Sequence, residues 1–281
     1  MKLSNNSVKS SKNILKKYFL DSERIKREKY FYLKFKNKNI NIPKLLSTSK
    51  NNISFKKYRF KKIKSQKLFF DELLNFLIKT NREKKYNLYA KENLVSYELL
   101  LSQIKKRFKK ISKINIEKKH IKKMKVIKSY VEKILKESPS TLKLYSCKNI
   151  ISQSDIGFHN CGIFNNKVFF YDFEYSGLDH PIKLICDTYY QPEKRISKKY
   201  ILNFKEKLEK SFKFKLPQNF FIFEKLLKVK MMLIILNILI PSNITNKSKL
   251  INKVELNKIK SDRINKVYNY IKIPFIYEQK I

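Results

Sequence analysis

Residues 152–160 read SQSDIGFHN, and residues 172–174 read DFE. All three glycines of the 281-residue chain lie between residues 157 and 177, close to these two motifs. The segment 151–193 holds six acids and two bases, although the whole chain has 65 Lys and Arg against 23 Asp and Glu. A local need for carboxylates and for unusual backbone angles indicates a functional site in this segment.

Length and composition predict a folded protein that has a well-buried core. A chain of 33.9 kDa with 42% hydrophobic residues suffices for one large domain or two lobes and argues against disorder. Three cysteines without a C-x-x-C pair predict neither a disulfide framework nor a zinc site, and they favour a reducing compartment. The amino-terminal MKLSNNSVKSSKN lacks the apolar region of a signal peptide, and the longest apolar run is shorter than the roughly 20 residues of a membrane span. We therefore expect a cytoplasmic protein without a membrane span.

The formal net charge of +42 has two interpretations. It could reflect a polyanionic partner such as nucleic acid, which basic surfaces bind. The chain is also rich in Lys, Asn, Ile, Phe and Tyr but has one alanine and no tryptophan, as expected of AT-rich codons. No array of arginines and stacking aromatics typical of a nucleic-acid module is present, so we favour codon drift and solvated faces over a nucleic-acid surface. The sequence does not indicate an oligomeric state.

Hydrophobic periodicity predicts an α+β protein with a small amino-terminal lobe and a larger, mainly helical lobe. The first lobe, residues 1–62, contains expected strands at 13–19 and 53–60 and a helix at 24–35 capped by Asp21 or Ser22. The second lobe, residues 63–281, contains further expected helices at 68–78, 94–108, 120–135, 198–212, 220–240 and 249–271.

A short β-hairpin is expected inside the second lobe. Residues 162–164 and 167–171 flank Asn165-Asn166, and asparagine tolerates the positive φ angles of a two-residue hairpin turn. A tight hairpin would return Asp172 to a place beside residues 155–160. The segment 152–187 is thus expected to form one compact site.

The spacing of these residues suits phosphoryl transfer to a hydroxyl. This chemistry needs a carboxylate to orient the attacking O–H and oxygen ligands to hold Mg²⁺ against nucleotide phosphates. Asp155 and Asn160 have the D-x-x-x-x-N spacing of a kinase catalytic loop. Asp172-Phe173-Glu174 stands where the metal-binding D-F-G of a kinase would stand. The spacing alone is a weak signal, which the hairpin and the D-F-E motif strengthen.

At these residues the chain resembles the aminoglycoside phosphotransferase/choline kinase-like family, in particular bacterial members reading roughly S-P-S-D-x-G-F-H-N and D-F-E-Y. The matching runs are 152–160 and 169–193, and weaker similarity extends to NILKKYF at 13–19 and to the late helix at 226–239. The resemblance implies a bilobal protein-kinase-like fold, ATP with Mg²⁺ as cofactors, and a small-molecule acceptor that carries a hydroxyl. The chain is thereby expected to be a small-molecule kinase acting on a sugar, an amino alcohol or an aminoglycoside-like compound.

The resemblance also assigns roles to single residues. Asp155 would be the catalytic base, and Asn160 and Asp172 would be the Mg²⁺ ligands. Lys16 would contact the nucleotide phosphates, and Glu28 would be its partner. Lys17 is the competing choice for that lysine, and the spacing does not decide between the two.

Two departures from the family pattern support the first of two alternative functions. The usual H-G-D reads Gln153-Ser154-Asp155 here, without the histidine that braces the loop. Only fifteen residues, none of them glycine, precede Lys16, so the nucleotide-covering part of the first lobe is expected to be short or missing. One alternative is a kinase-like protein that binds a ligand without catalysis. The other, which rests on the net charge of +42, is a basic protein that binds a polyanion.

Several neighbouring residues have two open interpretations. Glu174, Asp179 and Asp187 could attract a cationic acceptor, or they could brace the loop. His159 could contact a phosphate or the acceptor, although a loop histidine held by the backbone is the favoured interpretation.

Overall fold

A computed structural model of the chain describes residues 7–83, 85–240 and 252–277. Within them it has small antiparallel sheets and eight α-helices, which confirms the α+β class. The chain divides into two compact units. Unit 1 comprises Met1–Asn93 and Cys147–Lys215, and unit 2 comprises Leu94–Ser146 and Leu216–Ile281. The lobe boundary expected after residue 62 stays a prediction.

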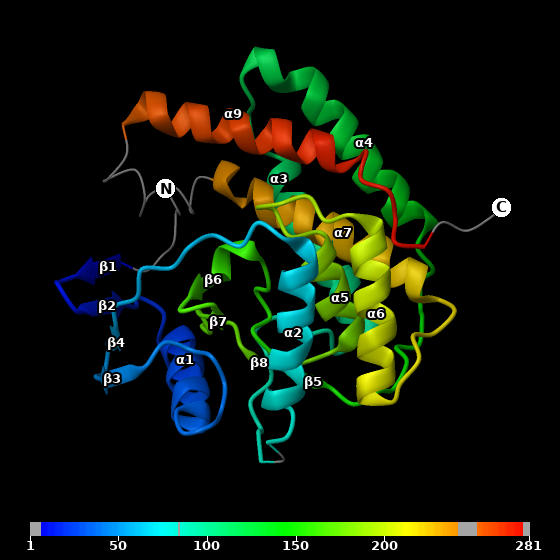
Figure 1. Cartoon of the computed structure of the whole chain (residues 1–281). Coiled ribbons are helices and arrows are strands. Elements are labelled where there is room, and N and C mark those ends of the chain that lie inside the picture. Colours follow the sequence, from blue (N-terminus) through cyan, green and yellow to red (C-terminus); the bar gives the residue numbers. More distant parts are fainter. Residues whose placement is uncertain (1–6, 84, 241–251, 278–281) are drawn as a thin grey trace. The chain divides into compact units, whose positions relative to one another are not determined.

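Unit 1 begins with a four-stranded antiparallel sheet (Figure 1). Its strands lie in the order β1-β2-β4-β3. The expected strand at 13–19 is β2, whereas the strand expected at 53–60 ends four residues early, as β4. Within the described residues, a single strand precedes β2. The bounds are β1 Ser7–Ser10, β2 Ile14–Tyr18, β3 Leu45–Thr48 and β4 Asn52–Lys56.

Helix α1, Ser22–Phe35, follows β2 and packs on this sheet. Asp21 caps it by accepting hydrogen bonds from the backbone N–H groups of Glu23 and Arg24, so Asp21 rather than Ser22 is the cap. One face of the helix is buried, and on it Tyr32 packs against Phe55 of β4 with ring centroids 4.6 Å apart. The buried side chains of α1 are Ile25, Glu28, Phe31, Tyr32 and Phe35. Glu28 is therefore a carboxyl on a core-facing helix surface.

The expected hairpin is present as β6, Cys161–Phe164, and β7, Lys167–Phe170. Phe164 pairs with Lys167, and both turn residues have positive φ, 47° at Asn165 and 58° at Asn166. The backbone N–H of Tyr171 donates to the carbonyl of Asn160 at 3.0 Å. The hairpin thus returns the chain to the catalytic-loop motif, as the sequence predicts.

Three short elements around this hairpin were not predicted. Strands β5, Ile150–Ser152, and β8, Gly177–Asp179, pair antiparallel, and helix α5, Pro181–Tyr189, follows β8. Gly177 lies against the backbone of Ala90, where an added Cβ would approach the Ala90 nitrogen to 2.2 Å, so only glycine fits. Helices α2, Gln66–Thr80, and α6, Lys198–Phe212, match their predicted positions and complete unit 1.

Unit 2 is helical. The helix expected at 220–240 is present as α7, which buries residues on all of its faces. Across the described residues, none of the helices is both long and apolar enough to span a membrane. The unit contains α3 Tyr97–Ser112, η1 Lys118–His120, α4 Ile121–Glu137, α7 Phe220–Leu236, η3 Asn237–Leu239 and α9 Lys253–Tyr270. The helix expected at 249–271 is thus confirmed from residue 253, and residues 249–251 lie outside the described residues.

Candidate active site

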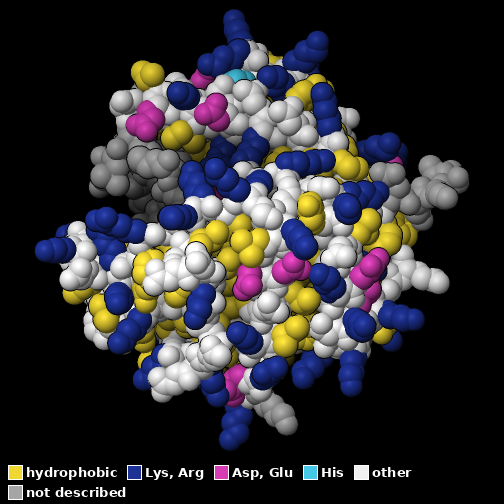
Figure 2. Space-filling view, viewed as in Figure 1, with side chains coloured by type: hydrophobic (Ala, Val, Ile, Leu, Met, Phe, Trp, Pro, Cys, Tyr) yellow, Lys and Arg dark blue, Asp and Glu magenta, His cyan; other side chains and the backbone are white. Residues whose placement is uncertain are grey.

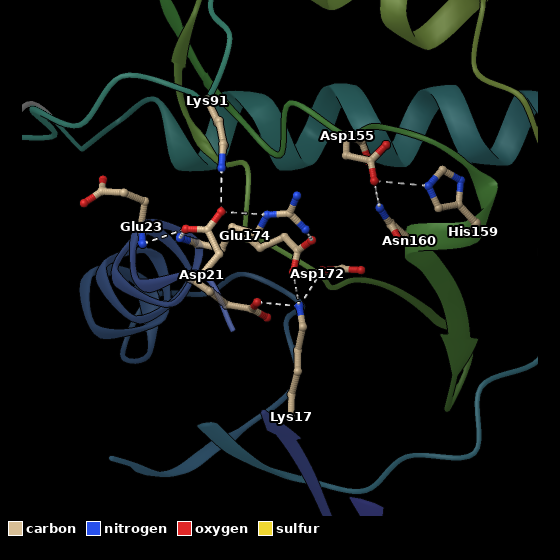
Figure 3. Close-up of polar contacts among 11 residues, drawn as sticks. Lys17, Asp21, Glu23, Lys91, Asp155, His159, Asn160, Asp172 and Glu174 are labelled. Carbon is tan, nitrogen blue, oxygen red and sulfur yellow. Dashed lines mark hydrogen bonds and ion pairs between the residues drawn. The ribbon is translucent and has the colours of Figure 1, made fainter. Parts of the chain in front are cut away.

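Lys17 of β2 lies among three carboxylates drawn from distant parts of unit 1 (Figure 3). Its Nζ is 2.6 Å from Glu28 Oε2, 2.6 Å from Asp172 Oδ1 and 3.1 Å from Glu174 Oε2. The Glu28 and Glu174 side chains are 1% and 6% exposed, whereas Asp172 is 27% exposed. Asp172 is therefore the member of this group that solvent or a ligand reaches most easily.

The lysine that pairs with Glu28 is Lys17, not the expected Lys16. Successive side chains of a strand point to opposite faces of the sheet, so neighbouring lysines cannot both face α1. Lys17 faces α1 and is buried, while Lys16 lies on the other face, with its Nζ 5.3 Å from the ring centroid of Tyr18. The face that meets α1 is set by tertiary packing, which spacing in the sequence does not report.

Burial and charge act in opposite directions on this cluster. Burial alone would lower the pKa of Lys17, but the charges of Glu28, Asp172 and Glu174 more than reverse this effect, and the pKa is raised. Burial raises the pKa of Glu28 to about 7, although the charge of Lys17 acts to lower it. Lys17 is thus a cation held firmly in place by its neighbours.

Phe173 fixes the two carboxylates beside it. Its side chain is fully buried and stacks on Phe31 of α1, with ring centroids 3.9 Å apart and an interplanar angle of 8°. It also stacks on Phe76 of α2 at 6.0 Å. Asp172 adopts φ = 69°, a left-handed conformation that is unfavourable for a non-glycine residue. The aromatic anchor and the ion pair to Lys17 together hold Asp172 in this conformation.

Arg24 extends the ion-pair network away from Lys17. Its Nη1 lies 3.1 Å from Glu174 Oε1 and its Nε lies 3.2 Å from Asp21 Oδ2, while Lys91 Nζ lies 2.7 Å from the same Asp21 oxygen. The guanidinium carbon also lies 4.8 Å from the ring centroid of Tyr175. Glu174 is therefore bound by two cations, which favours its bracing interpretation over attraction of a cationic acceptor.

Asp155 is held by residues of its own loop. Asn160 Nδ2 donates to Asp155 Oδ2 at 3.0 Å and to the Asp155 carbonyl at 2.9 Å. His159, expected to be held by the backbone, places its Nε2 3.4 Å from the same Oδ2. The Asp155 side chain is nevertheless 44% exposed. Asn160 and His159 thus orient one carboxylate oxygen of Asp155, while the carboxylate remains accessible to a ligand.

Gln153 stands where the family pattern has the histidine that braces the loop, and it braces the loop in that histidine's place. Its Nε2 donates to the carbonyl of Asn160 at 3.2 Å and to the carbonyl of Tyr171. These contacts tie the loop of Asp155 to the residue directly before Asp172. The glutamine therefore connects the two motifs, which corrects the expectation that the loop lacks a brace.

The charges of Asp155 and of two carboxylates of the Lys17 cluster act on the hydroxyl of Tyr175. Burial raises the pKa of the Tyr175 hydroxyl, and the charges of Glu174, Asp155 and Asp172 raise it further, against the effect of Arg24. Charges act on a hydroxyl in this way only at short range. Together with the hydrogen bonds that Gln153 donates to the carbonyls of Asn160 and Tyr171, this indicates that the two motifs lie close together in unit 1.

No family model and no curated protein sequence matches the chain, but many solved structures match it. A candidate aminoglycoside phosphotransferase from Ralstonia eutropha matches with a TM-score of 0.61 and 11% identity, over 95% of this chain and 92% of that chain. The chain has the fold of aminoglycoside phosphotransferases and choline kinases. A choline/ethanolamine kinase family protein from Mesorhizobium loti has a TM-score of 0.54 and 13% identity, over 96% and 86% of the two chains. Spectinomycin phosphotransferase, solved with ADP and spectinomycin, has a TM-score of 0.54 and 10% identity, over 96% and 91%. The expected kinase-like fold is therefore confirmed.

The oxygen donors of the site fit a hard divalent cation. Glu28, Asp172 and Glu174 each offer a carboxylate oxygen, and these atoms lie within 4.8 Å of one another. Lys17 pairs with all three carboxylates, and Arg24 also pairs with Glu174. Asp172 is the most exposed of the three, at 27%, and is therefore the carboxylate best placed to bind an ion. The side-chain amide of Asn160 donates through Nδ2, so its oxygen is the atom suited to a metal.

The site contains residues that the sequence did not reveal. The sequence analysis assigned no role to Arg24 or Lys183, and it identified Gln153 only as the residue that replaces the histidine of the family pattern. Asp179 and Asp187 both pair with Lys183, at 2.7 and 2.8 Å, which favours the bracing interpretation of these acids too. A lysine four residues from an acid on each side, within the acid-rich segment, was the available signal.

Proposed function

We propose that this protein is a Mg²⁺- and ATP-dependent phosphotransferase that acts on a hydroxyl group of a small molecule. The observation that carries the proposal is the ion-pair cluster in which Lys17 joins Glu28 of α1 to Asp172, which lies 155 residues after Lys17 in the sequence. A buried lysine fixed between a helix carboxylate and a more exposed aspartate is an arrangement suited to nucleotide phosphates and their metal ion. The phosphotransferase fold supports the same function.

Asp155 is proposed as the catalytic base. Its exposed carboxylate would accept a hydrogen bond from the acceptor hydroxyl and orient that oxygen for attack on the terminal phosphate. Asn160 and His159 would keep the carboxylate in a single orientation. Such positioning is the main contribution a protein makes to phosphoryl transfer.

Lys17, rather than Lys16, is proposed to bind the nucleotide phosphates, with Glu28 fixing its position. Asp172 and Asn160 are proposed to hold Mg²⁺. When bound, the ion would neutralise phosphate charge as it develops. Lys17 would then exchange part of its contact with Asp172 for contact with phosphate.

The acceptor class is a small molecule with a free hydroxyl: a sugar, an amino alcohol or an aminoglycoside-like compound. Glu174, Asp179 and Asp187 are each paired with a cationic side chain. They therefore give no specific support to a polycationic acceptor. A neutral sugar or amino alcohol is compatible with the same site.

The direct test is Asp155→Asn, which keeps the size of the side chain. Transfer of labelled phosphate from ATP to a panel of hydroxyl compounds, and to water, should fall by about 10²–10⁴-fold. The melting temperature should stay unchanged. Asp71→Asn is a matched control, because Asp71 is a partly exposed acid of α2 paired with Lys207. Equal phosphate transfer by wild type and Asp155→Asn would contradict the proposed base. Wild-type protein that binds ATP without any transfer would favour the non-catalytic alternative.

A further inference from the structure

Ser154, the residue directly before Asp155, has a strained backbone. Its φ is 61°, in the left-handed region where a side chain meets the following carbonyl. A non-glycine residue is strained in this region and persists there only where the surrounding structure holds it. The direction in which the chain leaves Ser154 determines where the Asp155 carboxylate points.

A buried charge cluster contacts the Ser154 side chain. Ser154 Oγ donates to Asp179 Oδ2 at 3.0 Å, and Lys183 Nζ donates to Ser154 Oγ at 2.9 Å and to the same Asp179 oxygen at 2.7 Å. Asp187 Oδ2 lies 2.8 Å from the ammonium on its other side. The Lys183 and Asp179 side chains are 5% and 0% exposed.

The cluster connects the loop of Asp155 to rigid elements. Asp179 is the last residue of β8, which pairs with β5 directly before the loop, and Lys183 lies one helical turn later in α5. Burial would lower the pKa of Lys183, but the charges of Asp179 and Asp187 more than reverse this, so the lysine stays charged. Its ammonium is thus a permanent donor to Ser154 Oγ.

We propose that Lys183 is a positioning residue for Asp155, acting by holding Ser154 in its left-handed conformation through the shared contact with Asp179. This inference rests on the proposed function, because it assigns the reason for the position of the proposed base. The contacts of the Lys183 ammonium are with Ser154, Asp179 and Asp187, so its proposed role needs no contact with the acceptor or the nucleotide. It acts through the backbone of the residue before the base.

Two substitutions at Ser154 separate this role from ordinary stabilisation. Ser154→Ala and Ser154→Gly both remove Oγ and the same hydrogen bonds. Alanine keeps the steric cost of the left-handed conformation, whereas glycine adopts it without strain. The proposal predicts that kcat falls on the order of tenfold in Ser154→Ala with little change in KM, and that Ser154→Gly stays within about twofold to threefold of wild type. Equal losses in the two variants would overturn it.

Lys183→Met provides a second test of the proposal. The proposal predicts a fall in kcat of at least about tenfold, and recovery of most of that loss in the double variant Lys183→Met/Ser154→Gly. The double variant should remain as unstable as Lys183→Met, because glycine does not neutralise Asp179. A double variant as slow as Lys183→Met would overturn the proposal.

Crystal structures give a readout that does not depend on turnover. Ser154→Ala should show residue 154 with negative φ and the Asp155 carboxylate separated from Asn160 Nδ2, while Ser154→Gly should keep both as in wild type. Unchanged loops in both variants would overturn the positioning role even if the wild-type protein transferred no phosphate. Failure of phosphate transfer in the wild type, with the loop shift present in Ser154→Ala, would reject the proposed function alone. If Lys183→Met does not fold, the comparison of Ser154→Ala with Ser154→Gly still tests the proposal.

Discussion

Lysines around the acid-rich segment of unit 1 differ from those of α3 and α4 in unit 2. Lys17 and Lys183 are buried, and each contacts two or three carboxylates at 3.1 Å or less. Residues 105–136 hold fourteen Lys and Arg against two acids, and Lys105, Lys109, Lys122 and Lys125 are all exposed. Figure 2 likewise shows many more basic than acidic side chains on the visible face.

The difference shows which charges carry information about function. A buried ammonium persists only if its surroundings provide counter-charges and hydrogen bonds, so its position is specified by the fold. An exposed lysine is solvated and contributes little to a particular geometry. The net charge of +42 is thus a poor guide to function, whereas Lys17 and Lys183, each buried among carboxylates, mark the candidate site.

The largest expected effect compares two neighbouring lysines. Lys17→Met would leave Glu28 and Glu174 buried without their shared cation, which should lower the free energy of unfolding by about 3–5 kcal/mol. Lys16→Met, on the other face of the same strand, should lower it by less than about 1 kcal/mol. Urea denaturation of both variants measures the difference. Equal losses would show that Lys17 is not the lysine that the fold depends on.

The next effect is a pH dependence at Glu28. Burial raises the pKa of Glu28 from its ordinary 4.5 to about 7, so the folded state binds this proton more tightly than the unfolded chain does. Its contribution to stability is fully present below about pH 4.5 and is lost as the pH rises through about 7, a change of about 3 kcal/mol.

Glu28→Gln removes this titration. The stability of wild type relative to Glu28→Gln should therefore decrease by about 3 kcal/mol between about pH 4.5 and about pH 8, as measured by denaturation across that range. Glu132→Gln, at an exposed acid of α4, is the control and should show no comparable trend. A difference between wild type and Glu28→Gln that does not vary with pH would contradict the raised pKa.

The smallest effect concerns the exposed lysines. Lys105 and Lys109 lie four residues apart on α3, and Lys122 and Lys125 lie three apart on α4, so each pair repels across one helical turn. Because Gln and Lys have similar helix propensities, the double variant Lys109→Gln/Lys125→Gln should be more stable by about 0.5 kcal/mol. Denaturation in low salt measures this gain. A loss of more than about 1 kcal/mol would mean that these lysines have structural partners.

Local patterns were sufficient to locate the site in the sequence. The spacing of Asp155 and Asn160, the D-F-E motif and the Asn165-Asn166 turn predicted a compact loop and hairpin, which are present. Long amphipathic helices and the capped helix after β2 were also predictable, because periodicity and caps are written in consecutive residues.

What the sequence could not supply depends on contacts between distant residues. The choice between Lys16 and Lys17 required knowing which face of β2 meets α1. Strands β5 and β8 are three residues each, too short for a periodic signal. The burial of Lys183 could not be predicted, because a lysine in a strongly basic chain is expected to be exposed. Only the fold shows that Asp179 and Asp187 both contact it.

The central claim is that the Lys17 cluster forms a working nucleotide–metal site, and a thermal-shift titration tests it most directly. ATP would be titrated with and without Mg²⁺ against wild type and Asp172→Asn, with inorganic triphosphate as the control for binding by charge alone. We predict a stabilisation of about 2.7 kcal/mol at 100 times Kd that requires Mg²⁺, exceeds the triphosphate shift and is lost in Asp172→Asn. Equal shifts with triphosphate, indifferent to Mg²⁺ and to the substitution, would contradict the claim.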